Sequence, residues 1–522
     1  MRARAIMLLG TSSHVGKSLL TAALCRIFAD QRVSVAPFKS QNMSLNSSAT
    51  IEGLEIGRAQ ALQAEAARIP ASVHMNPVLL KPAGNMTSQV VVRGKIWGRL
   101  SASDYHQRRV EELLPTVRES YEILAAKHEV IILEGAGSPA EINLKQHDIV
   151  NMRMAEIADA ACLLVGDIDR GGVFASLLGT VQLLDPTEQV RIHGFLINKF
   201  RGDVALLEPG IRMMEDRLQK PCLGIVPYMH HLALEEEDSL GLADITDQTE
   251  PWLTEDGPAG FLRIAIVALP SFSNFTDFDA LRNEPSVSLR FCRKPSQLAL
   301  AHIVILPGSK QTVEDLLWMR REGIASCVVA HASRGLLVGI CGGMQMLGTE
   351  IVDPLAIEHG GQADALGLLP FATHMNPDKV TRGVMGHLSL QTLFGQPVPA
   401  MDIGGYEIHV GETIYANGAQ TFSTLNHGEP DGCISSDTRI FGTYLHGIFD
   451  DDTFRHAFLA AARSFHQLAP VSHFGNWAQK REESFNQLAD TVRESLDLTR
   501  IFKWVGLRYK PHRQTERLEQ LH

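Results

Sequence analysis

The stretch LLGTSSHVGKSLLTAAL, residues 8–24, decides how the first half of the chain folds. An apolar run begins before it, over 4–9, and apolar residues recur at helical spacing over 17–29. Glycines between a strand and a helix let backbone N–H groups turn toward a phosphate, which the positive end of the helix dipole also attracts. The stretch therefore predicts a strand, a phosphate-binding loop and a helix in direct succession.

The loop inside this stretch has the composition of a nucleotide-binding loop. Five residues separate Gly10 from Gly16, one more than in the common pattern GxxxxGK[ST], so the loop is a variant of that pattern. Lys17 is expected to reach the β- and γ-phosphates of ATP, and the Ser18 hydroxyl to ligate Mg²⁺. Thr11 completes the set of predicted nucleotide-binding residues. A glycine-rich turn that binds nothing is the alternative.

Strand-like and helix-like segments alternate beyond this loop. Further apolar strands are expected at 33–38, 129–135, 161–167 and 192–200. Helical patterns occupy 57–69 and 148–159 between them. Near-continuous apolar strands separated by helices predict an α/β fold in which a parallel sheet is covered on both faces.

A second alternating unit follows an acidic segment. Its strand-like runs lie at 261–271, 301–310, 334–343, 404–412 and 439–449. We therefore predict a P-loop parallel-sheet domain at 1–234, an acidic linker at 235–260, a second α/β domain at 261–455 and a helical C-terminal extension at 456–522. The extension is rich in Arg, Glu and Gln, and this composition is typical of a surface appendage.

The segment LLVGICGGMQMLG, residues 336–348, places a cysteine between an apolar run and a helical pattern. Cys341 has the G-x-nucleophile-x-G spacing of a nucleophile elbow, whose tight turn requires small neighbours and presents the nucleophile above the sheet. The N–H of Gly342 is then placed to donate to a developing oxyanion, and Gly308 in PGSKQT (307–312) is the expected second donor. An inert buried thiol is the alternative, and it is the default interpretation of the other cysteines.

A thiol nucleophile needs a base, and His446 in GTYLHGIF (442–449) is the candidate. It ends a strand-like run, where it can meet a nucleophile at the top of the same sheet. His409, in YEIHVGE (406–412), lies within a strand-like segment and is expected to line or support the pocket instead.

Polar residues also follow other predicted strands. Glu134 ends the run EVIILEG, and the carboxyl ends of parallel strands border the crevice where ligands bind. Glu134 is therefore the predicted Mg²⁺ ligand, directly or through water, with a helix cap or solvated acid as the alternative. Asn198 and Lys199 come after the strand expected at 192–197, where nucleotide-binding folds often read the base; a plain loop is equally expected there.

Composition disfavours several classes of protein. With 48 basic and 59 acidic residues the net charge is −11, which argues against a nucleic-acid binder. No apolar run reaches the ~18 residues of a membrane span, and the N-terminal apolar stretch leads into the glycine loop without a cleavage site. The 7 cysteines are scattered without a CxxC pair, which disfavours a disulfide framework or a zinc site. We expect a cytoplasmic protein that acts on small-molecule substrates.

The motifs of the two halves resemble two known groups. The loop GTxxxVGKS and the stretch EGAGS (134–138) resemble the dethiobiotin-synthetase group of ATP-dependent ligases, whose members activate a carboxylate by phosphorylating it. Partition ATPases carry a further lysine near the start of the loop, where this chain has Thr11 and Ser12. Cys341 with His446 resembles the class I glutamine amidotransferases, which hydrolyse glutamine to ammonia through a cysteine thioester. The second domain is thus expected to be a class I glutamine amidotransferase α/β domain.

Together the two halves resemble the cobalamin-pathway glutamine amidotransferases, from the N-terminus to about residue 450. Further matching stretches are PFKSQNMSLNS (37–47), GRAQALQAEAA (57–67), NPVLLKP (76–82), GDIDRGGVFAS (166–176), NKFRGD (198–203), LPGSKQT (306–312) and GGYEIHVGET (404–413). The resemblance implies ATP- and glutamine-dependent amidation of the b, d, e and g carboxylates of adenosylcobyrinic acid a,c-diamide. Formation of the a,c-diamide itself, or amidation of another acceptor, is the alternative.

The resemblance also implies roles for residues near the nucleotide loop. Lys39 follows a strand end and is expected to contact the γ-phosphate. The residues assigned to the region that meets the corrin or the acyl phosphate are Gln41, Asn42, Asn46, Asp167, Asp169 and Arg170. Simple turn chemistry is the alternative for all of them.

One position departs from the class I pattern. Most class I amidotransferases have Glu two residues after the catalytic histidine, where this chain has Ile448. Asp450 or Glu407 is then the candidate to orient His446, unless the site works as a dyad.

Two functions of other classes stay open. A nucleotide switch or scaffold with an inactive amidotransferase domain is disfavoured by the intact Cys341 and His446. A papain-like protease would have no use for the GKS loop. Because ammonia is protonated and lost in water, the resemblance also predicts a sheltered passage between the two halves.

Overall fold

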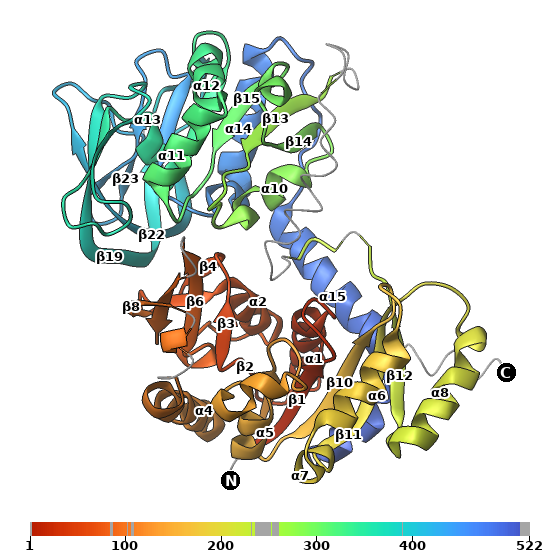
Figure 1. The fold of residues 1–522 in the computed structure, drawn as a ribbon. Helices are drawn as coiled ribbons and strands as arrows, with labels where there is room; N and C mark the ends of the chain where they lie inside the picture. The colour runs from red at the N-terminus through yellow and green to blue at the C-terminus, as the bar shows by residue number, and fades with distance from the viewer. Residues whose placement is uncertain are drawn as a thin grey trace.

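A parallel sheet forms the centre of the N-terminal domain (Figure 1). The computed structural model describes residues 3–83, 87–101, 103–105, 109–230, 232–234, 252, 260–388 and 390–511. The six strands of the sheet run in the order β12-β11-β10-β1-β9-β2, and every neighbouring pair is parallel. They are β1 (Arg4–Gly10), β2 (Val35–Phe38), β9 (Val130–Glu134), β10 (Ala161–Asp167), β11 (Ile192–Phe200) and β12 (Cys222–Pro227). The predicted parallel sheet is confirmed, and the loop after β1 emerges where the strand order reverses, which is where such folds bind ligands.

Helices cover both faces of this sheet because its strands carry apolar residues on both sides. The helices among the described residues of the domain include α1 (Lys17–Asp30), α2 (Arg58–Ala66), α4 (Leu114–Lys127), α5 (Met152–Ala158), α6 (Val173–Leu183), α7 (Pro186–Gln189) and α8 (Val204–Leu218). In β1, Met7 and Leu9 belong to one core, whereas Ile6 and Leu8 belong to the other. Burial on both faces explains why the strand reads as a continuous apolar run.

Two small sheets project from this domain toward the second one (Figure 1). A four-stranded sheet contains β3 (Gln41–Met43), β6 (Val78–Ala83), β7 (Thr87–Val92) and β8 (Lys95–Ser101). A pair is formed by β4 (Ser47–Ala49) and β5 (Glu55–Gly57). Hydrogen bonds join them to the second domain: the Ser47 N–H donates to Asn274 Oδ1 at 2.9 Å, and the Phe275 N–H donates to Asn46 Oδ1 at 3.3 Å.

The second domain is built on another six-stranded sheet, in the order β14-β13-β15-β16-β26-β25. All its pairs are parallel except β25 with β26. The strands are β13 (Leu262–Val267), β14 (Val287–Cys292), β15 (Ile303–Leu306), β16 (Leu336–Ile340), β25 (Cys433–Ile434) and β26 (Ile440–Thr443). The helices around it include α10 (Asp279–Arg282), α11 (Thr312–Arg321), α12 (Ile324–Ala332) and α13 (Gly342–Leu347).

A second sheet, antiparallel except for the parallel pair of β17 with β19, flanks this one. Its strands are β17 (Glu350–Asp353), β18 (Gly361–Asp364), β19 (Phe371–Leu388), β22 (Met401–Tyr415), β23 (Ser423–Leu425) and β24 (Pro430–Asp431). A short pair, β20 (Thr392–Leu393) with β21 (Gln396–Pro397), lies between the long strands in the sequence. The segment 404–412 is therefore a strand, but the expectation that it continues the alternating unit was wrong, since β22 pairs antiparallel with β19 in this other sheet.

The C-terminal helices are part of both domain cores. They are α14 (Asp452–Phe465), α15 (Trp477–Ser495) and α16 (Leu498–Trp504). Phe458 of α14 is buried in the second domain, whereas Phe485 of α15 and Phe502 of α16 are buried in the first. Phe502 stacks on Phe28 of α1 with ring centroids 4.1 Å apart, and α15 runs beside α1 (Figure 1). The interpretation of this segment as a surface appendage was wrong, because its few apolar residues gather on one helix face.

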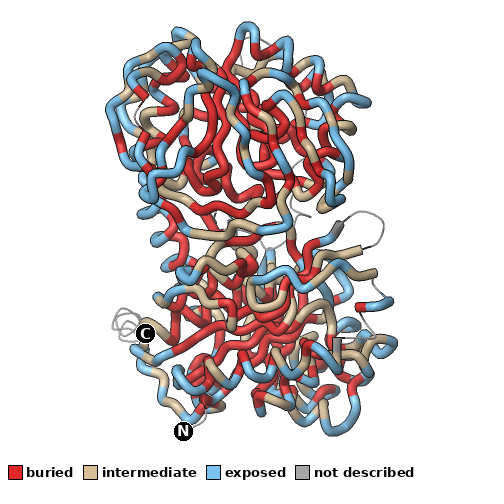
Figure 2. Tube along the Cα trace, turned by 90° about the vertical axis from the view of Figure 1, so that its left-hand side faces the viewer, coloured by how far each residue is buried: buried red, intermediate tan, exposed pale blue. Residues whose placement is uncertain are grey.

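Two separately buried interiors are visible, joined by a narrower region (Figure 2). The acidic linker expected at 235–260 lies outside the described residues, apart from the buried Trp252 and Gly260 at its end. Within the described part of the chain, no helix combines the length and the apolar character needed to cross a membrane.

Candidate active sites of the two domains

The predicted nucleotide loop joins β1 directly to α1. Gly16 has φ of 93°, and a Cβ there would lie 2.2 Å from Asn198 Nδ2, so a side chain is excluded at this position. Lys17 curls back over the loop, and its Nζ donates to the carbonyl oxygens of Ser12 at 3.1 Å and Gly137 at 3.3 Å. Gly10 lies under this ammonium group, where a Cβ would be 2.7 Å from Lys17 Nζ. The strand–loop–helix succession is confirmed.

Glu134, at the end of β9, is the centre of the polar cluster beside this loop. It is 1% exposed, and its Oε1 accepts from Ser18 Oγ at 2.9 Å and from Lys39 Nζ at 2.9 Å. Its Oε2 accepts from Gln63 Nε2 at 2.7 Å. A carboxylate beside a hydroxyl at the end of a phosphate loop is the hard oxygen set that Mg²⁺ prefers. The structure thus brings Ser18, Glu134 and Lys39 together.

Gln63 was missed by the sequence reasoning. It lies on α2, and both Gln60 and Gln63 are fully buried there. The available signal was a pair of amides three residues apart on a helix rich in alanine. Gln60 Oε1 accepts from Asn42 Nδ2 at 3.1 Å. The amides of α2 therefore connect the polar cluster around Glu134 with the small sheet that contains β3.

Asn198 and Lys199 contact the loop itself. Asn198 Nδ2 donates to the Val15 carbonyl oxygen at 2.8 Å, and Lys199 Nζ donates to the His14 carbonyl oxygen at 2.6 Å. Lys199 also pairs with Asp167 Oδ2 at 3.1 Å. These donors therefore hold the shape of the loop.

The other residues assigned to the corrin or acyl-phosphate region are spread over three places. Asp169 follows β10 and pairs with Arg201 at 3.1 Å, and Arg170 beside it is exposed. Gln41 Oε1, on β3, accepts from the Tyr105 hydroxyl at 2.6 Å. Asn46 lies at the domain boundary, as described above.

Cys341 occupies the sharp turn that its glycine neighbours predicted. It lies between β16 and α13 with φ of 50° and ψ of −110°, a conformation that is rare for a residue with a side chain. Its N–H donates to the Thr443 carbonyl oxygen of β26 at 2.8 Å. A Cβ on Gly343 would lie 1.9 Å from the Leu306 carbonyl oxygen, so the turn fits only with glycine there.

His446 is oriented by Asp277. The Nδ1 atom of His446 is 2.7 Å from Asp277 Oδ2, and the Gly447 N–H donates to Asp277 Oδ1 at 3.0 Å. Burial alone would lower the pKa of His446, but the charges of Asp277 and Cys341, and hydrogen bonds to both, raise it to about 10. Asp277 is 3% exposed, so this pair is shielded from water.

The expectation that Asp450 or Glu407 orients His446 was therefore wrong, and so was the dyad. Glu407 accepts from Arg382 Nε at 2.5 Å and lies 3.7 Å from His409 Nε2. Asp277 was missed because it precedes His446 by 169 residues, in the turn Phe275–Phe278, where no motif marks it. Only the three-dimensional structure brings the two side chains together.

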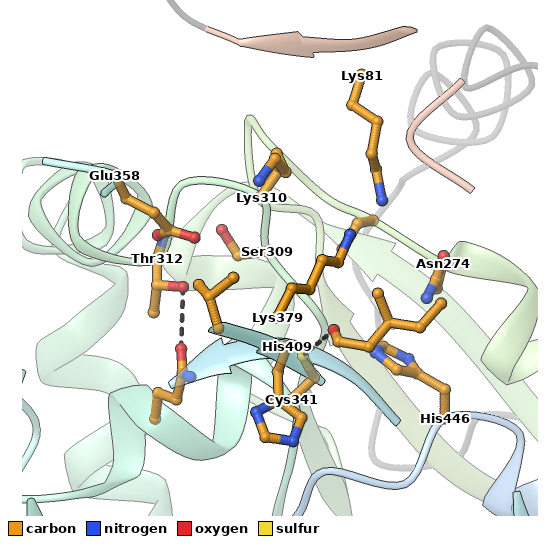
Figure 3. Close-up of a pocket in the computed structure, with 14 residues that line it drawn as sticks. Lys81, Asn274, Ser309, Lys310, Thr312, Cys341, Glu358, Lys379, His409 and His446 are labelled. Carbon is orange, nitrogen blue, oxygen red and sulfur yellow. Dashed lines mark hydrogen bonds between the residues drawn. The ribbon is translucent and has the colours of Figure 1, made fainter. Parts of the chain in front are cut away.

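The pocket above Cys341 gathers side chains from several elements (Figure 3). Its lining is Lys81, Ser273, Asn274, Ser309, Lys310, Thr312, Cys341, Gln345, Glu358, Lys379, Ile408, His409, Val410 and His446. Gly308 lies beside the histidine, where a Cβ would be 3.1 Å from His446 Cε1, and a Cβ on Gly342 would be 2.9 Å from the Ser309 nitrogen. His409 lines the pocket, as expected, and its ring stacks on Tyr444 with centroids 3.9 Å apart.

Comparison with known families agrees with this division of the chain. Residues 6–241 match the CobQ/CobB/MinD/ParA nucleotide binding domain, and residues 263–454 match the CobB/CobQ-like glutamine amidotransferase domain. The fold, the phosphate loop and the Cys341–His446–Asp277 arrangement define the class of protein: an ATP-dependent amide ligase that takes its nitrogen from glutamine.

Full-length relatives identify the family within that class. The chain is 46% identical to a cobyric acid synthase of Syntrophobacter fumaroxidans, over 97% of this chain and 99% of the relative. It is 47% identical to one from Sorangium cellulosum over 97% and 99%, and 45% identical to one from Moorella thermoacetica over 97% and 98% of the two chains. The chain belongs to the cobyric acid synthase family.

Proposed function

We propose that the chain amidates the b, d, e and g side-chain carboxylates of adenosylcobyrinic acid a,c-diamide, and so forms adenosylcobyric acid. Each amide consumes a glutamine, an ATP and a water, and releases glutamate, ADP and phosphate. The observation that carries the proposal is the presence of a glutaminase-type Cys–His–Asp site and an ATP-type phosphate loop on one chain of this family. The free thiols of the chain fit a reducing cytoplasm.

The glutaminase half begins with the Cys341 thiolate attacking the carboxamide carbon of glutamine. The N–H groups of Gly342 and Gly308 are the proposed donors to the oxyanion of the tetrahedral intermediate. His446 gives its proton to the leaving nitrogen, so ammonia departs and a thioester remains. His446 then takes a proton from water, which attacks the thioester and releases glutamate. Asp277 holds the ring by Nδ1, which leaves Nε2 for these proton transfers.

The ligase half activates the acceptor carboxylate. A carboxylate oxygen of the corrin attacks the γ-phosphorus of ATP, ADP leaves, and an acyl phosphate forms. Lys17 and Lys39 are the proposed partners of the transferred phosphoryl oxygens. When bound, Mg²⁺ neutralises phosphate charge, and Ser18 and Glu134 are the residues that would hold it. Ammonia then attacks the acyl carbon and displaces phosphate.

We further propose that the corrin lies between the small sheet that contains β3 and the residues at the carboxyl end of β10. Gln41 and Asn42 of β3 are one part of this region, and Asp167, Asp169 and Arg170 after β10 are the other. The linker at 235–260 and the domain limits 1–234 and 261–455 complete the proposed organisation.

The test is direct measurement of the corrin product. Purified protein is incubated with Mg·ATP, ¹⁵N-amide glutamine and adenosylcobyrinic acid a,c-diamide, and the corrin is analysed by mass spectrometry. We expect stepwise gain of labelled amides at the free carboxylates, loss of this gain in Cys341→Ala, and its return when ammonia is supplied. An unchanged corrin, with glutaminase and ATPase activities intact, would reject this acceptor and leave only the ligase class.

A further inference from the structure

The pocket above Cys341 is closed by side chains from both domains. Lys81 comes from β6 of the nucleotide domain, whereas Lys310 and Lys379 come from the amidotransferase domain. Figure 3 shows Lys81 approaching from the nucleotide-domain side and the other two lysines on the opposite side of the opening. We call these three residues the lysine lip. Glu358 is the acidic residue of the same lining.

A buried carboxylate holds two members of the lysine lip in place. Glu55 of β5 is 1% exposed, and its oxygens lie 2.7 Å from Lys81 Nζ and 2.5 Å from Lys379 Nζ. Burial alone would raise the pKa of Glu55, but Lys379 and Lys81 hold it well below its usual range. The ammonium groups of two domains are therefore fixed at one carboxylate, and one ion pair crosses the domain boundary.

Lys310 is different, because no hydrogen bond or ion pair of its ammonium group is found within the described ranges of the chain. Burial lowers its pKa, Glu358 opposes this effect, and Lys81 reinforces it. Lys310 is partly buried, and an ammonium group that is partly removed from water is stabilised when a ligand supplies the opposite charge. The lip carries three ammonium groups against two carboxylates, Glu55 behind it and Glu358 in the lining, so an excess of positive charge faces the pocket.

We propose that the lysine lip binds the α-carboxylate of glutamine while Glu358 faces its α-ammonium group. This inference rests on the proposed glutaminase function and adds the recognition of its substrate. Glutamine presents a carboxamide at one end and a zwitterion at the other, and the pocket has a nucleophile below and both charges at its opening. Because Lys81 belongs to the nucleotide domain, the glutamine site is complete only when the two domains are docked.

The test compares two substrates that differ only at the proposed subsite. L-Glutaminamide keeps the side-chain carboxamide but carries an uncharged amide in place of the α-carboxylate. Release of the side-chain amide nitrogen is measured for both, as free ammonia plus corrin-bound nitrogen, with Mg·ATP and the corrin present. In Lys310→Met, kcat/KM for glutamine should fall ~10- to 100-fold, and that for glutaminamide less than 3-fold. Lys127→Met, on the exposed end of α4, is the matched control.

The contribution of Lys81, from the nucleotide domain, is tested in variants in which Glu55 is replaced by the uncharged Gln. Removing Lys81 alone would leave the buried Glu55 carboxylate with only one of its two ammonium partners, so Glu55→Gln/Lys81→Met is compared with Glu55→Gln. The double variant should lower the glutamine-to-glutaminamide ratio of kcat/KM by a further ~10-fold. An equal ratio in the two variants would remove Lys81 from the subsite.

Equal losses for both substrates in Lys310→Met would overturn the proposal, because a purely structural role, or binding of a corrin carboxylate by the lip, predicts that result. No loss of kcat/KM for either substrate in that variant would overturn the proposal as well. Failure of the proposed corrin reaction is seen separately, as absence of labelled corrin, since ammonia release from glutamine is counted whether or not the corrin accepts it.

Discussion

At the scale of single residues, Asp277 explains how the site can work although Ile448, and not a glutamate, stands two residues after His446. One Asp277 oxygen contacts His446 Nδ1 at 2.7 Å and the other accepts from the Gly447 N–H at 3.0 Å. The carboxylate therefore fixes the ring and the backbone that carries it. Ile448 is 1% exposed and packs in the core, a position that a charged residue would occupy only at a cost.

Asp277→Asn should impair the glutaminase reaction selectively. The amide keeps the shape of the side chain but loses the charge that orients His446 and stabilises its protonated form. We expect kcat with glutamine to fall by ~10²- to 10⁴-fold, while amidation with added ammonia stays within about 2-fold of the unaltered protein. Steady-state kinetics with the two nitrogen sources make the comparison. An equal loss with ammonia would mean that Asp277 supports the fold and not this step.

The same pair should make stability depend on pH. The pKa of His446 rises from 6.5 to about 10 on folding, so the folded state binds this proton more tightly than the unfolded state. The resulting stabilisation is full below pH ~6.5 and is lost as the pH rises toward about 10. The Tm difference between the unaltered protein and Asp277→Asn should thus be largest near pH 6 and shrink toward pH 10. A difference that is constant over this range in calorimetry would contradict the ion pair.

The residues that could be predicted at this scale are those with local chemistry. Cys341 was predicted because glycines flank it, and Lys17 because it ends a glycine loop between a strand and a helix. Asp277 and Gln63 could not be predicted, since each acts through a partner far away in the sequence. A turn residue and a helical amide carry no mark of such contacts until the chain has folded.

At the scale of elements, continuous apolar strands were easy to predict and charged helices were not. β1, β9 and β10 are buried on both faces, so their sequences are apolar except at the strand ends. Most residues of α15 are polar, and its buried face depends on a few positions such as Phe485 and Val492. Composition averages over the faces of a helix, so it described α15 as a surface element when one of its faces lies in a core.

Phe485→Ala should therefore destabilise the nucleotide domain, although the residue lies almost at the opposite end of the chain. Phe485 is 1% exposed within the core that also contains the residues of α1. Removing a buried aromatic ring should lower the free energy of unfolding by about 3–5 kcal/mol. Chemical denaturation of the full chain measures this change. Gln487→Ala, on the exposed face of α15, is the control and should change it by less than about 0.5 kcal/mol; similar effects of the two changes would contradict the packing of α15.

At the scale of the whole molecule, two chemistries on one chain should be separable by substitution. Lys17→Ala should abolish ATP-dependent amidation from either nitrogen source, because it removes a phosphate ligand; it should leave the Cys341 site folded. Cys341→Ala should abolish the use of glutamine but keep amidation with ammonia. Parallel assays of ADP, glutamate and corrin amide check the pattern. Loss of ammonia-dependent amidation in Cys341→Ala would show that the two sites are not independent.

The domain boundary should also keep ammonia from escaping. Two hydrogen bonds cross it in opposite directions, from Ser47 N–H to Asn274 and from Phe275 N–H to Asn46, and Asn274 also lines the pocket above Cys341. Ammonia released at Cys341 therefore forms beside the part of the domain boundary that these two hydrogen bonds hold closed, which we call the seam. With ¹⁵N-amide glutamine in an excess of unlabelled ammonium, at a pH where little free ammonia exists, the amides formed should be mainly ¹⁵N.

Asn46→Ala removes one of these bonds and should open the seam without touching the nucleophile. We expect the unlabelled fraction of the corrin amides to rise several-fold, and more glutamate to form per amide, while kcat for glutamine hydrolysis changes by less than ~3-fold. Asn417→Ala, at an exposed position of the second domain, is the control. If Asn46→Ala keeps the label as well as the control does, the passage does not depend on this seam, and ammonia must reach the acyl phosphate by a route that the two asparagines do not border.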